Sequence, residues 1–134
     1  MRIERLARAH SILGWLTFLA FLGSGFSLLR PDYHGGSEVV RALSRANHLY
    51  LLGAALLHLL AARAGGAPGK LRARLRGVGS LVLFGVPPVL LAAFVREPTQ
   101  GLEDRPLTML GLVLALIGTG LIALTTPKAH DPSA

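Results

Sequence analysis

The sequence predicts an all-α integral membrane protein, folded as an antiparallel bundle of four transmembrane helices. Of its 134 residues, 51% are hydrophobic and only 16% are charged, whereas a soluble domain has roughly a quarter of its residues charged. The charged residues lie in short clusters that separate long apolar stretches. This pattern excludes a water-soluble enzyme and a disordered basic tail, because neither combines long apolar runs with so few charges.

Four apolar stretches indicate helices at about residues 9–29, 37–63, 71–96 and 106–126. A membrane-spanning helix needs about 20 residues, and the first, third and fourth stretches are long enough. The second is short unless a polar segment from about Ser37 adds helical turns outside the bilayer. The first stretch is longer than the apolar core of a signal peptide, so we expect a retained helix. We expect one membrane domain over residues 1–134, with a flexible tail at 127–134.

The connections between the stretches favour tight turns. Residues 64–69 read Ala-Gly-Gly-Ala-Pro-Gly, a helix-breaking cluster that turns the second helix into the third. Pro106 suits the first turn of the fourth helix, where its missing N–H costs nothing.

Lys and Arg are distributed unequally between the two sides of this bundle. Nine flank the side with both chain ends and five lie in the opposite loops. Because short cytoplasmic loops are rich in Lys and Arg, we expect a multi-pass protein of the cytoplasmic (inner) membrane with both termini in the cytoplasm. The formal charge of +7 then reflects contact with anionic lipid headgroups. No nucleic acid partner is expected, since no basic stripe is interleaved with aromatic residues.

Small residues predict which helix faces meet, because membrane helices associate through close packing. Three rows are expected to face inward: His10, Gly14, Thr17, Phe21 and Ser24; Tyr50, Ala54, His58 and Ala62; and Gly111, Ala115, Thr119 and Ala123. In the third helix, Pro87 and Pro88 should kink the chain and free backbone carbonyls, either as simple packing or as a hinge.

Histidines are the candidate cofactor ligands, since the chain contains no cysteine. A rise of about 1.5 Å per residue places His10 and His58 near one level and His48 and His34 near the opposite interface. Imidazole binds heme b and transition metals, so a histidine-ligated heme or metal-binding redox protein is one hypothesis. Segment 45–63, with a deep His58 and a terminal Arg63, resembles a ligand-bearing helix of membrane b-type cytochromes. The third and fourth helices, however, supply no histidine.

Two other hypotheses remain. In one, an interfacial pocket orients a quinone, a lipid headgroup or a small solute, for binding or for transport by an oligomer; its residues are Tyr33, His34, Arg45, Asn47, His48 and Tyr50. In the other, the protein is not an enzyme. Its histidines bond between helices, and it serves as an accessory, scaffold or assembly subunit with itself or a membrane partner. We favour the latter, because no apolar stretch contains Asp or Glu and no catalytic arrangement is evident.

Overall fold

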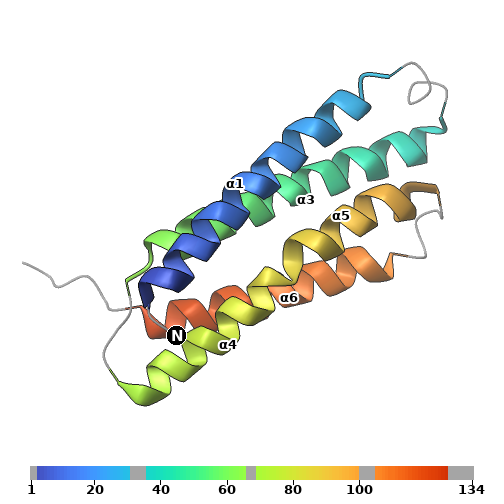
Figure 1. Cartoon of the computed structure of the whole chain (residues 1–134). Helices are drawn as coiled ribbons and strands as arrows, with labels where there is room; N and C mark the ends of the chain where they lie inside the picture. The colour runs from blue at the N-terminus through green and yellow to red at the C-terminus, as the bar shows by residue number, and fades with distance from the viewer. Residues whose placement is uncertain (1–2, 31–35, 66–68, 100–104, 127–134) are drawn as a thin grey trace, which may run out of the picture.

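The computed structural model describes residues 3–30, 36–65, 69–99 and 105–126, and every regular element in these ranges is helical. The elements are α1 (Ile3–Ser27), α3 (Glu38–Arg63), α4 (Lys70–Phe84), α5 (Val86–Arg96), the short 3-10 helix η1 (Glu97–Thr99) and α6 (Pro106–Thr125). Because α4 and α5 follow one another as a single interrupted helix, the chain forms a four-helix bundle (Figure 1).

Three helical segments are long and apolar enough to cross a membrane: Glu4–Ser27, Lys70–Thr99 and Pro106–Thr125. The remaining helix of the bundle, α3, is 26 residues long. It carries polar residues along much of its length and is not one of these three membrane-length segments. It packs on α1, α5, η1 and α6. These neighbours bury Ser44, Asn47 and His58, whereas the charged residues Glu38, Arg45 and Arg63 are exposed.

Two expected helix boundaries differ from the structure. The first helix begins by Ile3, not near residue 9, because the basic N-terminal segment also has a buried face that includes Leu6 and His10. The third helix is not continuous over 71–96 but breaks at Gly85. The expected flexible tail at 127–134 lies outside the described residues.

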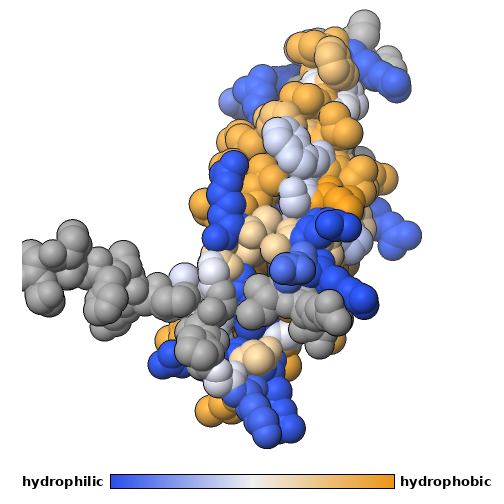
Figure 2. All heavy atoms as spheres, turned by 60° about the vertical axis from the view of Figure 1, so that its left-hand side comes forward, coloured by the Kyte–Doolittle hydropathy of each residue, from blue (hydrophilic) through white to orange (hydrophobic). Residues whose placement is uncertain are grey.

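The bundle consists of two helix pairs joined mainly through α3. One pair is α1 with α3, and the other is α6 with α4 and α5 (Figure 1). The shared core contains Leu51 and Ala54 of α3 together with Leu83, Val86 and Leu90 of α4 and α5. The exterior is also apolar: hydrophobic side chains cover much of the face in Figure 2, and Leu81, Leu116 and Leu124 are each more than two-thirds exposed.

The backbones of α4 and α6 approach each other closely at Gly79 and Gly118. A Cβ atom on Gly118 would lie 3.0 Å from the Gly79 carbonyl oxygen and 3.0 Å from the Leu83 amide nitrogen. Glycine is required here because the backbones are too close for a side chain.

The expected inward row of α6 is only partly correct. Gly111 is buried, but Ala123 is exposed, and the buried face continues instead through Gly118 and Thr125. A helix with 3.6 residues per turn rotates by about 40° over every four-residue step. A row of period four therefore drifts off the interface, whereas a row of period seven stays close to it.

Candidate functional site

A buried histidine pair joins α1 to α3, and one of its members also contacts α4. His10 of α1 and His58 of α3 are 1% and 0% exposed, and their Nδ1 atoms lie 2.9 Å apart. His58 Nε2 lies 3.1 Å from the carbonyl oxygen of Leu83 on α4. The expected proximity of the two histidines is confirmed, whereas their role as cofactor ligands stays a prediction.

The hydrogen-bond pattern defines the tautomers of the neutral pair. A carbonyl only accepts, so His58 Nε2–H donates to Leu83, and His58 Nδ1 must then accept from His10 Nδ1–H. This leaves His10 Nε2 as an acceptor, and it is buried without a hydrogen-bond partner among the residues that the structure describes. Both ring nitrogens of His58 are thus occupied by protein groups.

The Leu83 carbonyl needs a donor from His58 because the residue four positions later is Pro87, which has no backbone N–H. In an α-helix the carbonyl of residue 83 would accept from the N–H of residue 87, but residue 87 is proline and has no N–H. The helix breaks at Gly85, and Pro87 lies in the first turn of α5. The expected kink at Pro87 and Pro88 is therefore present, and His58 satisfies one of the carbonyls that it frees. Whether this kink moves as a hinge stays a prediction.

The ring of Phe84 packs against both rings of the histidine pair. Its ring lies 4.6 Å from the His10 ring and 5.9 Å from the His58 ring, which it faces at an interplanar angle of 3°. The two imidazoles are themselves 5.0 Å apart between centroids. As they stand, the rings pack on each other rather than around an open space.

A buried arginine lies at the same end of the bundle. Arg76 of α4 is 3% exposed and donates to the carbonyl oxygens of Gly65 at 2.7 Å, Ala61 at 3.4 Å and Ala64. These carbonyls close the C-terminal end of α3, where helix dipoles favour a cation. In the sequence, Arg76 is one of the nine Lys and Arg residues on the side of the chain ends, and its burial was not predicted, because its acceptors lie at the end of another helix.

A second polar cluster lies at the opposite end and contains a buried carboxylate. Glu97 is 1% exposed; Oε1 accepts from the N–H groups of Leu107 at 2.6 Å and Thr108 at 3.0 Å, and Oε2 accepts from the Thr108 hydroxyl. Arg105 Nε lies 3.9 Å from Oε2. Glu97 thus caps the start of α6 from ten residues upstream. The apolar stretches contain no acidic residue, but the bundle interior does contain one, Glu97.

Asn47 connects this cluster to α3. It is 1% exposed, donates through Nδ2 to Ala93 of α5 at 3.1 Å, and accepts through Oδ1 from Arg105. The Thr108 hydroxyl, whose proton goes to Glu97, lies 3.2 Å from the same Oδ1. The neighbouring His48 faces α1 instead, where its Nδ1 lies 2.8 Å from the Ser24 hydroxyl. These two candidate pocket residues therefore bond to different helices.

The other candidate pocket residues are less closely grouped. Arg45 is exposed and Tyr50 is half-buried, with the Tyr50 ring packed against the hydrophobic core. Tyr33 and His34 lie outside the described residues. Within the described ranges, no group of three or more His, Cys, Asp or Glu side chains is placed to hold a metal ion.

We expect Glu97→Gln to lower the free energy of unfolding by about 1–2 kcal/mol. The amide nitrogen would meet the backbone donors of α6, and the charge-assisted hydrogen bonds would be lost. Urea or thermal unfolding in detergent measures this effect. Glu38→Gln, at an exposed position, is the matched control and should change stability by less than about 0.5 kcal/mol. Equal losses would show that Glu97 does not cap α6.

Two lateral grooves complete the description of candidate sites. One lies between α3 and α6 and has a volume of about 180 Å³; the other lies between α1 and α5, beside Pro87 and Pro88, with about 220 Å³. Both are smaller than the roughly 300–1,000 Å³ typical of drug-sized ligands.

Comparison with protein-family models, curated proteins and solved structures finds no match to this chain. The fold and the described side chains therefore define its class: a helical bundle with apolar membrane-length helices and two internal polar clusters.

Proposed function

We propose that the chain is a small non-enzymatic membrane protein that acts as an accessory, scaffold or assembly subunit. In this proposal the helices form an antiparallel transmembrane bundle in the cytoplasmic membrane, with both termini in the cytoplasm. The observation that carries the proposal is the use of both His58 ring nitrogens by protein groups. A histidine engaged in this way joins helices and has no free nitrogen with which to bind a substrate.

The other internal polar groups support the same function. Asn47, Glu97 and Thr108 bond to one another or to backbone groups of neighbouring helices, and Arg76 bonds to the end of α3. Interhelical hydrogen bonds of this kind stabilise membrane bundles. Pairing of His10 with His58 and of Ser24 with His48 supports an antiparallel arrangement of α1 and α3.

The function is tested by purifying the tagged protein from membranes in a mild detergent. We expect a higher-order assembly, with itself or with a second membrane chain, on size exclusion and native mass spectrometry. We also expect an absorption spectrum without a Soret band and no stoichiometric metal. A monomer that retains one heme or metal ion per chain would contradict the proposal and favour the histidine-ligated redox protein. A monomer that retains a quinone or solute would favour the ligand-binding hypothesis.

The proposed orientation predicts the accessibility of introduced cysteines, and the native chain has none to interfere. Glu38→Cys and Thr99→Cys lie at one end of the bundle, and both positions are exposed. They should react with a membrane-impermeant maleimide in intact cells. Gly65→Cys, at the other end, should react only after the membrane is opened. Labelling of Gly65→Cys in intact cells would reverse the orientation.

A further inference from the structure

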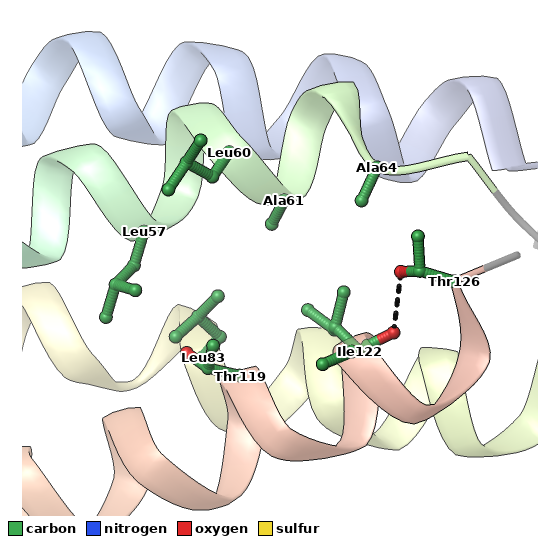
Figure 3. A pocket seen from close by; sticks show the side chains of 9 residues that line it. Leu57, Leu60, Ala61, Ala64, Leu83, Thr119, Ile122 and Thr126 are labelled. Atoms are coloured by element: carbon green, nitrogen blue, oxygen red, sulfur yellow. Dashed lines mark hydrogen bonds between the residues drawn. The ribbon is translucent and has the colours of Figure 1, made fainter. Parts of the chain in front are cut away.

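The groove between α3 and α6 lies at the end of the bundle where both helices finish (Figure 3). Its lining combines the small side chains Ala61, Ala64 and Ala123 with leucines of α3 and with Leu83 of α4. Its lining is almost entirely apolar, and the one hydrogen bond drawn in Figure 3 joins the Thr126 hydroxyl to the Ile122 carbonyl at 3.0 Å. The groove is thus a narrow hydrocarbon surface that opens sideways.

Positive charge is concentrated at the end of the bundle where this groove lies. Arg76 lies seven residues before Leu83, so the two share a face of α4, and it donates to Ala61 and Ala64 in the groove lining. No salt bridge joins Arg76 to a carboxylate in the described parts of the chain. Arg63, in the last turn of α3, and Lys70, at the start of α4, are exposed at the same end. A ligand with a hydrocarbon chain and an anionic headgroup complements this arrangement.

We propose that the groove binds one acyl chain of an anionic phospholipid, whose phosphate pairs with Arg63 and Lys70 at this end of the bundle. The proposal rests on the membrane placement proposed above and adds a discrete lipid site to it. A groove of about 180 Å³ that opens sideways accommodates a segment of a single acyl chain. The groove between α1 and α5 has a similar volume and likewise no charged lining residue, but it is lined from the middle of α1 and the start of α5, away from the basic end of the bundle. It therefore serves as an internal comparison.

Filling the groove provides the first test. Native mass spectrometry of the detergent-solubilised chain, titrated with phosphatidylglycerol, should show one tightly bound lipid. Ala123→Trp places an indole in the groove lining and should weaken this binding at least about tenfold, since displacing two buried methylenes already has that effect. Leu124→Trp is the matched control, because Leu124 is the next residue on α6, is 76% exposed and does not line the groove. It should bind like the parent chain.

Removing the charges of Arg63 and Lys70 provides the second test. The double variant Arg63→Gln with Lys70→Gln should lose about tenfold in affinity for phosphatidylglycerol and little for phosphatidylcholine. The control Arg5→Gln with Arg8→Gln removes the same charge from α1, which does not line the groove, and should retain the preference. The lipid-site proposal would be contradicted if the parent chain bound phosphatidylglycerol and phosphatidylcholine equally well. It would also be contradicted if each variant and its control lost the same affinity for phosphatidylglycerol. A chain that still required detergent for extraction would leave the proposed membrane placement intact.

Discussion

Replacement of His58 by alanine is expected to lower the free energy of unfolding by about 2–4 kcal/mol. The change leaves the His10 Nδ1–H without a partner and removes the His58 donor from the Leu83 carbonyl, and each buried polar group that loses its hydrogen bond costs about 1–3 kcal/mol. Pro87 has no N–H with which to form the regular helical bond to Leu83, so that carbonyl keeps only the contact with the N–H of Gly85 at the end of α4. Equilibrium unfolding in detergent micelles, followed by circular dichroism, measures the effect.

His48→Ala is the matched control for this prediction. His48 lies on the same helix and pairs with Ser24 of α1, but it is only partly buried and bonds to one group. Its loss should cost about 1 kcal/mol or less. A double-mutant cycle of His10→Ala with His58→Ala should show coupling, because the two rings bond to each other. Additive losses, or equal losses at His48 and His58, would contradict a structural role for the pair.

Substitution of Gly118 by alanine is expected to destabilise the bundle by about 1–3 kcal/mol, the range found for overpacking. The added methyl would lie 3.0 Å from the Gly79 carbonyl oxygen and 3.0 Å from the Leu83 amide nitrogen. Backbone atoms cannot rotate away as a flexible side chain can, so α4 and α6 must separate. Thermal unfolding in detergent provides the measurement.

Gly120→Ala distinguishes this close contact from a general effect of alanine on α6. A Cβ atom at Gly120 would meet nothing within 4 Å, and alanine favours helix formation over glycine by up to about 1 kcal/mol. The two substitutions, only two residues apart, should therefore change the free energy of unfolding in opposite directions. Destabilisation of similar size at both positions would show that α4 and α6 do not approach as closely as described.

The sequence by itself determined the helical class of this protein and most of its helix ends, although not the start of α1 at Ile3. Apolar runs of about 20 residues specify three of the helices directly. Helix-breaking residues determine the ends, as at Pro106 and at the break before Pro87. The level of His10 relative to His58 also followed from sequence, because a constant rise per residue fixes depth along a helix. All of these features are local, and local features are what a sequence expresses.

The sequence predicted that His10, Thr17, Ser24 and His58 face inward, and they are buried. Only the tertiary structure decided that Glu97 and Arg76 are buried as well and what they bond. Glu97 follows the third apolar stretch, yet it caps α6; the one sequence signal for this was that Arg105, the residue before α6, is not a residue type that caps helices. Arg76 belongs to the basic flank of the chain, yet it is buried against the end of α3. The rotation of α6 about its axis, which buries Gly118 and exposes Ala123, likewise could not be predicted from the sequence. These features depend on groups brought together from different helices, and the rotation of a helix with 3.6 residues per turn is set by the neighbours against which it packs.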